Sequence, residues 1–170
     1  MILRIFKYPD PKLKKKTKPV SKISKEIFQL TDDMIETMLQ IDGVGLAANQ
    51  VGSDLRIFVI NTSPSDEKPQ PIVVINPEIL NQQGETVDDE GCLSFPELYL
   101  RIARPAEVRI HAKNLYNESF ILETTGILAR AVMHEIDHLN GILFIEHADK
   151  TEQDKINEYL KKIDLNNQDS

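Results

Sequence analysis

Residues 124–141 read TTGILARAVMHEIDHLNG, and the rest of the chain is expected to pack around them. Apolar residues recur here at helical spacing but occupy more than one face, which is typical of a helix buried on all sides. We expect the helix to start near Thr124-Thr125 and to stop before Gly141, because glycine is a natural C-terminal cap. Its apolar residues are Ile127, Leu128, Ala131, Val132, Ile136 and Leu139.

Within this expected helix, the run His134-Glu135-Ile136-Asp137-His138 carries four ionisable side chains. His134 and His138 are four residues apart, so their side chains project from the same face. Two neutral imidazoles on one face make half of a tetrahedral metal site. Glu135 follows the first of them and can reach a water at the metal as general base. A divalent cation would also offset the cost of burying three of these polar groups.

Asp137 needs a partner of its own, because a buried carboxylate without one is unfavourable. Arg104 and Arg130 are the two candidates, and the sequence does not rank them.

The third protein ligand lies outside this run. Astacin-like and matrix-type zinc proteases place a third histidine after a glycine, but Phe144 holds that position here and His147 is out of register. Thermolysin-like proteases use a glutamate further along the chain, and Glu158 could serve, although it lies on an expected surface helix. The remaining candidate is Cys92, in Glu90-Gly91-Cys92-Leu93-Ser94. A thiolate with two imidazoles leaves a fourth position open for water, so beside the histidine pair we favour Cys92.

Residues 43–50 read Gly-Val-Gly-Leu-Ala-Ala-Asn-Gln, and their small side chains leave the backbone open to a binding partner. Such a segment can pair with an extended peptide through main-chain hydrogen bonds. Gln50 would then offer an amide donor near the reacting carbonyl. The segment lacks the spacing of a phosphate-binding loop.

The remaining patterns predict an α+β fold, because strands and helices do not alternate as parallel crossover units require. We expect a single domain of antiparallel β-sheets packed around the buried central helix with its His-Glu-x-x-His motif. The expected elements are an extended arm over 8–20, a helix from Ser24 to about Gln40, strands at 55–60, 72–75, 98–103, 106–112 and 118–123 with a turn at Tyr116-Asn117, and a helix from Thr151. Residues 1–165 are assigned to the catalytic domain and 166–170 to a frayed tail.

Composition narrows the class of protein. The chain has 170 residues, the size of one ordinary domain, and 41% of them are hydrophobic. A net charge of −7 argues against wholesale nucleic-acid binding, so DNA is not an expected partner. No apolar run approaches the ~20 residues of a membrane span, and the start has no secretory segment, so we expect a cytoplasmic protein. The single cysteine, Cys92, rules out an internal disulfide.

Three segments together resemble the signatures of the peptide deformylase family. The family pattern is glycine, apolar, glycine, apolar, Ala-Ala-x-Gln, then Glu-Gly-Cys-Leu-Ser, then His-Glu-apolar-Asp-His. This sequence matches every defined position in the right order, and the similarity covers roughly residues 1–150. The resemblance implies a metal-dependent hydrolase that removes the formyl group from formyl-methionine at the N-terminus of new polypeptides and releases formate.

The resemblance also implies roles for individual residues. Cys92, His134 and His138 would bind the metal, and Glu135 would activate the water and later protonate the leaving amine. The Gln50 amide and the backbone N–H of Leu93 would hold the oxyanion. Backbone at Val44 and Gly45 would pair with the substrate, and its methionine side chain would enter a pocket near Val44, Ile127, Ala131 and the His134 ring. Glu90 would support the site from behind.

Cofactor and partners follow from the same resemblance. One divalent ion is expected, Fe²⁺ in the cell, with Zn²⁺, Ni²⁺ or Co²⁺ as alternatives in purified protein. The partners are N-formylmethionyl nascent polypeptides. Lysines crowd the start of the chain, and they form either a solvated basic edge or a patch that makes transient contact with the ribosome. These lysines are Lys7, Lys12, Lys14, Lys15, Lys16, Lys18, Lys22 and Lys25.

One position departs from the family. Some members carry an arginine at the entrance of the site, where Tyr99 stands here, and Arg101 lies two positions on. Substrate preference beyond the first residue is therefore open. Two other classes of protein would also use these residues: a zinc endopeptidase, and a non-catalytic metal or redox-sensing module built on Cys92.

Overall fold

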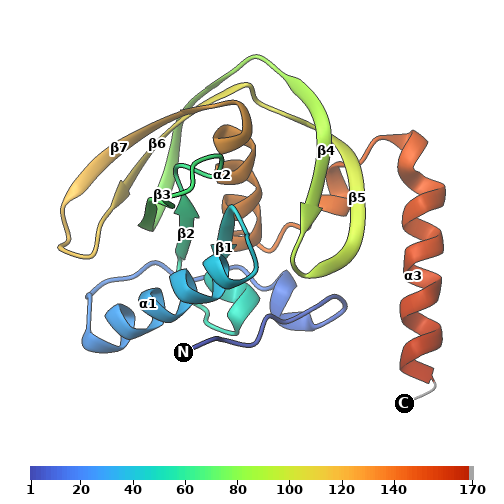
Figure 1. The fold of residues 1–170 in the computed structure, drawn as a ribbon, viewed down its shortest axis with the longest axis horizontal. Coiled ribbons are helices and arrows are strands. Elements are labelled where there is room, and N and C mark those ends of the chain that lie inside the picture. The colour runs from blue at the N-terminus through green and yellow to red at the C-terminus, as the bar shows by residue number, and fades with distance from the viewer. Residues whose placement is uncertain (169–170) are drawn as a thin grey trace.

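A computed structural model of the chain describes residues 1–168, as two antiparallel sheets around one central helix (Figure 1). The helices are α1 (Lys25–Gln40), α2 (Gly126–Leu139) and α3 (Gln153–Gln168), with 3-10 turns η1 (Pro11–Lys14), η2 (Ala48–Val51), η3 (Phe144–His147) and η4 (Lys150–Glu152). The strands are β1 (Gly45–Ala47), β2 (Ile57–Asn61), β3 (Pro71–Gln83), β4 (Thr86–Cys92), β5 (Phe95–Arg104), β6 (Glu107–Lys113) and β7 (Ser119–Thr125).

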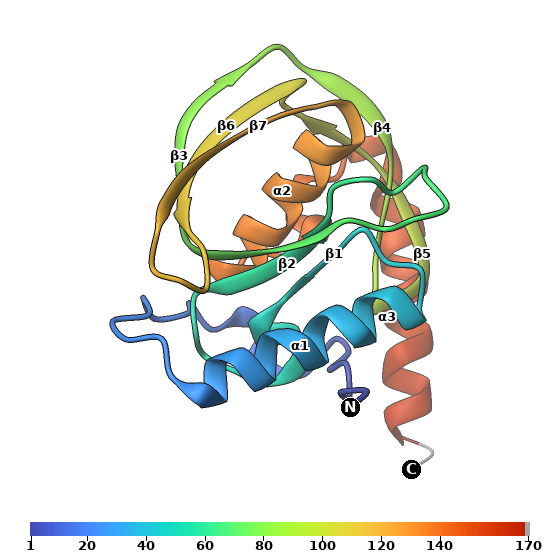
Figure 2. The ribbon, with the colours of Figure 1, turned by 60° about the vertical axis from the view of Figure 1, so that its left-hand side comes forward.

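The strands form a five-stranded sheet in the order β1-β2-β3-β6-β7 and a two-stranded sheet of β4 and β5. Every pair of neighbouring strands is antiparallel, which confirms the predicted α+β class. Figure 1 shows α2 between the larger sheet and the β4–β5 ribbon, and Figure 2 shows β3, β6 and β7 curving over it. The helix with the histidines is thus the central element of the fold.

The core explains why α2 is held in place. Apolar side chains of α2, Ala129, Val132, Ile136 and Leu139, are buried against β2, β3 and β6. A second cluster packs α1 against β1 and β2, and a third joins η1, β5, η3 and α3. Burying an aliphatic side chain contributes roughly 1.5–3 kcal/mol, so these clusters fix α2 relative to both sheets.

The end of α2 is also fixed by close approach. Gly141 has a φ of +75°, and a Cβ added there would lie 2.4 Å from the carbonyl oxygen of Lys14. The predicted stop before Gly141 is therefore confirmed, and no larger residue fits. The start is also close to prediction, since Thr125 occupies the N-cap position.

Several predicted boundaries are wrong. Strand β3 runs to Gln83 rather than ending at residue 75, with register shifts in its pairing to β6. The sequence gives no sign of this, because Asn76-Pro77 interrupts the apolar run and residues 78–83 are exposed, with only Ile79 and Leu80 apolar among them. Strands β1 and β4 were not expected, since one is three residues long and the other reads Thr-Val-Asp-Asp-Glu-Gly-Cys.

The two ends of the chain also differ from expectation. The arm over 8–20 contains the turn η1 and is not extended throughout. Helix α3 starts at Gln153, after a 3-10 turn in which Asp149 accepts a hydrogen bond from the Thr151 amide, so Asp149 is the capping residue there. It continues to Gln168, so residues 166–168, expected to fray, are helical; 169–170 lie outside the described residues. Within 1–168, every helix is too short or too polar to cross a bilayer.

Candidate metal centre

The predicted histidine pair meets the predicted cysteine. His134 and His138 are one turn apart on α2, with their Nε2 atoms 3.1 Å from each other. The Cys92 Sγ atom, at the end of β4, lies 3.3 Å from His138 Nε2. Among the described residues, these three form the group whose ligand atoms could share one ion, all within 4.8 Å. The alternative ligands His147 and Glu158 are not part of it.

Local backbone geometry places the sulfur. The β4–β5 pairing shifts register after Gly91, which faces Tyr99, so that Cys92 pairs with Phe95 instead. A Cβ at Gly91 would lie 2.7 Å from Tyr99 Cε1, so the close packing there requires glycine. This irregular end of β4 turns Cys92 toward α2.

The three donor atoms fit a divalent transition metal. A tetrahedral ion at ~2.0–2.1 Å from each nitrogen and ~2.3 Å from sulfur separates the nitrogens by ~3.3 Å and nitrogen from sulfur by ~3.5 Å. Two of the three separations, 3.1 Å between the nitrogens and 3.3 Å between Cys92 Sγ and His138 Nε2, are close to these values, and all three atoms lie within 4.8 Å of one another. A thiolate with two imidazoles suits zinc and iron, and three protein ligands leave one position for a reacting molecule.

Glu90 orients the first histidine. His134 Nδ1 donates to Glu90 Oε2 at 2.7 Å, which leaves Nε2 free to face the cluster. Burial opposes ionisation of Glu90, but hydrogen bonds from His134 and Arg104 hold its pKa well below the usual range. The hydrogen bond between Glu90 and His134 agrees with the supporting role expected for Glu90. Such partners fix the tautomer and ring orientation of a metal-binding histidine.

Two buried arginines complete this network. Arg104 donates to both Glu90 oxygens, at 3.0 and 2.8 Å, and to Asp137 Oδ2 at 2.6 Å. Arg130 donates to Glu90 Oε1 at 3.2 Å and to the Ile102 carbonyl oxygen at 2.8 Å. Of the two candidate partners for Asp137, Arg104 is therefore the one that binds it.

Glu135 lies against the cluster without belonging to it. It is buried, and its Oε2 atom has no hydrogen-bond partner among the described residues. Burial raises the pKa of Glu135 to about 7, although the charge of His134 opposes the rise. A carboxylate with such a pKa and a free oxygen is suited to proton transfer.

A cavity of about 460 Å³ opens onto this face. It is lined by the predicted residues Val44, Gly45, Gln50, Leu93, Ile127, Ala131, His134 and Glu135. Ile127 is 58% exposed although it lies on the central helix, since it faces the cavity mouth and not the core. Tyr99 also lines the cavity and is 59% exposed. The structure thus brings all the predicted site residues to one cavity or to the Cys92–His134–His138 cluster in its wall.

Gln50 is held beside the cysteine. Its Oε1 accepts the Ala47 amide hydrogen at 3.0 Å, and its Nε2 donates to Ser94 Oγ at 3.2 Å, 3.9 Å from Cys92 Sγ. Ser94 Oγ in turn donates to the Phe6 carbonyl oxygen at 2.7 Å. Sequence reasoning gave Ser94 no role of its own, although it closes the Glu-Gly-Cys-Leu-Ser motif.

Comparison with known proteins gives a consistent result. The polypeptide deformylase family profile matches residues 2–154. The peptide deformylase of Mesorhizobium japonicum is 43% identical over 156 residues, covering 91% of this chain and 89% of the relative. That of Thermodesulfovibrio yellowstonii is 47% identical over 145 residues, covering 85% and 88%.

Solved structures of peptide deformylases superimpose on nearly the whole of this chain. A peptide deformylase from Legionella pneumophila superimposes with a TM-score of 0.88 at 35% identity, covering 100% of this chain and 99% of that one. The Plasmodium falciparum enzyme gives 0.90 at 31% identity, covering 98% of both.

Proposed function

The chain belongs to the polypeptide deformylase family of hydrolases, which remove the N-formyl group from nascent polypeptides, and from this premise we propose how its own residues carry out the reaction. The observation that supports the proposal is the convergence of one thiol sulfur and two imidazole nitrogens beside a buried carboxylate on a substrate-sized cavity. We propose that the catalytic domain comprises residues 1–165.

Cys92, His134 and His138 hold the single metal ion in this proposal. When bound, a divalent ion supplies a Lewis acid that lowers the pKa of water and polarises a carbonyl. Cys92 would be a thiolate, and Glu90 and the α2 backbone keep the two rings turned toward it. The ion in the cell is proposed to be Fe²⁺, which lies low in the divalent affinity series, so Zn²⁺, Ni²⁺ or Co²⁺ can replace it on purification.

Glu135 moves the protons. Its carboxylate accepts a proton from the attacking water as the water oxygen adds to the formyl carbon. When the carbon–nitrogen bond breaks, Glu135 delivers that proton to the amine nitrogen. Formate and a free methionyl N-terminus leave. The unpaired Oε2 of Glu135 supports this role, because a general base needs an oxygen not already engaged by the protein.

Gln50 and Leu93 stabilise the oxyanion. The Gln50 amide is fixed on both sides by Ala47 and Ser94, so its N–H groups are oriented before substrate arrives. The backbone N–H of Leu93 follows the proposed sulfur ligand directly. Removing one such donor typically costs ~10²–10³ in rate.

The substrate is held by β1 and α2. Gly45 lies in β1 at the edge of the larger sheet, and Val44 precedes it, with its carbonyl oxygen accepting from the Asn61 amide at 2.8 Å. The remaining backbone groups of these two residues are suited to pairing with an extended peptide. The methionine side chain enters between Val44, Ile127 and Ala131, beside the His134 ring. One methylene in such an apolar pocket discriminates by ~1–3 kcal/mol.

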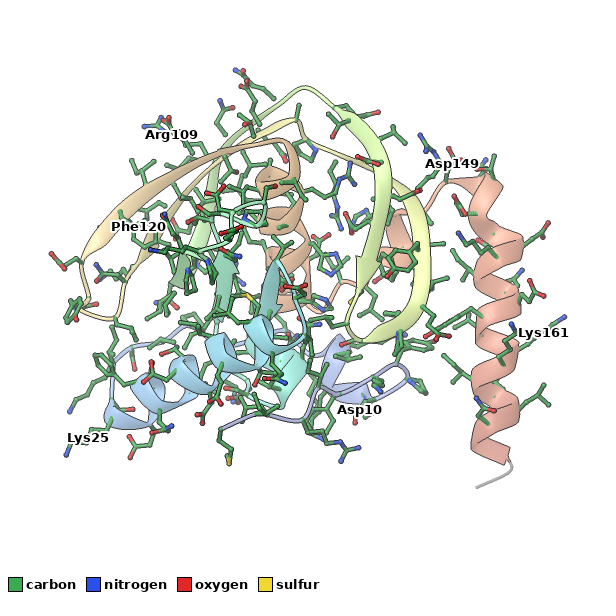
Figure 3. All side chains as sticks on the ribbon, viewed as in Figure 1. Asp10, Lys25, Arg109, Phe120, Asp149 and Lys161 are labelled. Atoms are coloured by element: carbon green, nitrogen blue, oxygen red, sulfur yellow. The ribbon has the colours of Figure 1, made fainter. Side chains whose placement is uncertain are left out.

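The protein is proposed to work in the cytoplasm with transient ribosome contact. The eight lysines between Lys7 and Lys25 are exposed, although the whole chain is acidic. Figure 3 shows Lys25 pointing outward at the start of α1. A basic surface of this kind suits ribosomal RNA.

Formate release tests the proposed function. The purified protein is incubated anaerobically with formyl-Met-Ala-Ser, and formate and free amine are measured beside formyl-Gly-Ala-Ser and unformylated Met-Ala-Ser. We expect faster formate release from the formyl-methionyl peptide than from the formyl-glycyl peptide, and no cleavage of the unformylated peptide. Internal cleavage would point to an endopeptidase, and equal rates on the two formyl peptides would contradict the pocket assignment.

Cys92→Ala tests the metal centre. Only two protein ligands would remain, so metal affinity and activity should both fall severely. In the wild type, Cys92 should resist thiol reagents while the metal is bound and react once a chelator removes it. A Cys92→Ala protein with full metal content and near-normal rate would overturn the ligand set.

A further inference from the structure

Asn49 lies behind the second histidine, on η2 next to Gln50. It is only 3% exposed, and its Nδ2 donates a hydrogen bond to the backbone carbonyl oxygen of His138. That carbonyl belongs to the last turn of α2, where carbonyl groups lack the usual helical partner, and it also accepts the Gly141 amide hydrogen at 3.0 Å. Thr17 Oγ1 binds the next carbonyl, that of Leu139, at 2.8 Å. The end of α2 is therefore held by side chains from other parts of the chain.

Two polar atoms in this contact lack partners among the described residues. They are Asn49 Oδ1, an acceptor, and His138 Nδ1; His138 is 1% exposed. When Nε2 of a histidine binds a metal, Nδ1 carries the hydrogen and becomes a donor. Leaving a buried donor or acceptor unpaired is unfavourable, because the group has lost its hydrogen bonds to water. The two atoms are thus chemically complementary and belong to residues already joined by a hydrogen bond.

We propose that Asn49 is a positioning residue for His138, acting through the carbonyl contact and through one buried water that accepts from His138 Nδ1–H and donates to Asn49 Oδ1. A water is required because the two atoms make no direct hydrogen bond, and buried waters commonly satisfy such pairs. The inference rests on the proposed metal centre. It gives His138 a partner equivalent to the one that Glu90 gives His134.

The two partners differ in charge, which has a chemical consequence. The anionic Glu90 makes His134 a stronger electron donor, whereas a neutral amide and water fix His138 without adding charge. Asn49 also stands at the one undefined position of the Ala-Ala-x-Gln pattern. The role is therefore specific to chains that carry an amide there, and the family signature does not contain it.

The test compares Asn49→Ala with Asn61→Ala. Asn61 is a matched control, because it is also buried and its Oδ1 accepts from the Ser63 and Gln70 amides, away from the cluster. Zinc-loaded proteins are challenged with excess chelator, and zinc release is followed alongside thermal unfolding. We expect Asn49→Ala to bind zinc ~10–100-fold more weakly, the usual effect of losing such a partner, while Asn61→Ala loses stability only.

Nitrogen-15 NMR of the histidines gives a readout independent of affinity. In the zinc-loaded wild type, the Nδ1 proton of His138 should exchange slowly with solvent. It should be lost to fast exchange in Asn49→Ala and retained in Asn49→Asp, which keeps an acceptor oxygen. A rapidly exchanging proton in the wild type would overturn the proposal even when no variant folds.

Failure of the positioning role and failure of the proposed metal centre would give different results. Zinc affinity within twofold of wild type in folded Asn49→Ala overturns the positioning role alone. Unchanged zinc binding in Cys92→Ala overturns the metal centre, and the inference falls with it.

Discussion

Glu135 lies beside the proposed metal-binding cluster but supplies none of its ligand atoms. A change at Glu135 should therefore affect the reaction rate and not the metal content. We expect Glu135→Gln to keep the metal and lose ~10²–10⁴ in rate, the usual contribution of a general base. Glu135→Ala should behave in the same way. Metal content by elemental analysis and formate release on the same sample check this. Loss of metal together with activity would assign Glu135 a ligand role instead.

Single residues were predictable where chemistry and periodicity agree. His134 and His138 follow from helical spacing alone, because any helix brings residues four apart to one face. Cys92 followed from excluding other third ligands and from thiolate chemistry beside two imidazoles, and the family motif agreed with it. The register shift after Gly91 that turns it inward has no pattern in the sequence. Arg104 and Arg130 could not be ranked, because only the strand pairing places Arg104 between Glu90 and Asp137.

At the scale of elements, β1 and α2 meet at Gly45. A Cβ there would lie 2.9 Å from Glu135 Cγ, closer than side chains normally pack. We expect Gly45→Ala to displace the Glu135 side chain, lowering kcat at least tenfold with metal content unchanged, by analogy with other small displacements at a reacting centre. Gly43→Ala is the matched control, because its Cβ would make ordinary contacts of 3.4–3.5 Å. Equal kcat values for the two variants would refute the steric explanation.

Arg104 on β5 joins β4 to α2, so its removal tests how the elements are held together. Arg104→Met should destabilise the protein by ~3–5 kcal/mol. Glu90 would lose its two-bond partner and keep only Arg130 and His134, and Asp137 would keep only the exposed His147. Arg109→Met removes an exposed ion pair with Glu123, and it should cost ~1 kcal/mol or less. Urea unfolding of both variants gives the comparison. Similar losses would mean that the buried network contributes no more than a surface pair.

Elements were predictable according to their length and the regularity of their burial. Helices α1 and α2 are long and apolar at helical spacing, and both were placed within about two residues. Strand β1 has three residues of which two are glycine or alanine, and three of the seven residues of β4 are consecutive acidic residues, so neither carries a strand pattern. These two strands are held by their partners β2 and β5 rather than by local preference.

In the whole molecule, the proposed metal centre lies between two parts of the fold. Cys92 belongs to the β4–β5 sheet, while the histidines belong to the helix packed on the larger sheet. An ion that binds only the folded form stabilises it by ~2.7 kcal/mol at one hundred times its dissociation constant. For a domain of this size, that amounts to a rise of ~5–10 °C in Tm. Calorimetry before and after chelation should show it, and Cys92→Ala should show little change.

The position of β1 at the edge of the larger sheet has a consequence for timing. A chain that pairs with this edge beside Val44 and Gly45 must present its first residues as an extended strand, so an N-terminus already packed into a folded domain cannot enter. If the substrate pairs with β1 as proposed, removal of the formyl group competes with folding of the nascent chain. Proteins whose first residues are buried soonest leave the shortest window, and they are the ones that would retain a formyl group if this enzyme became scarce.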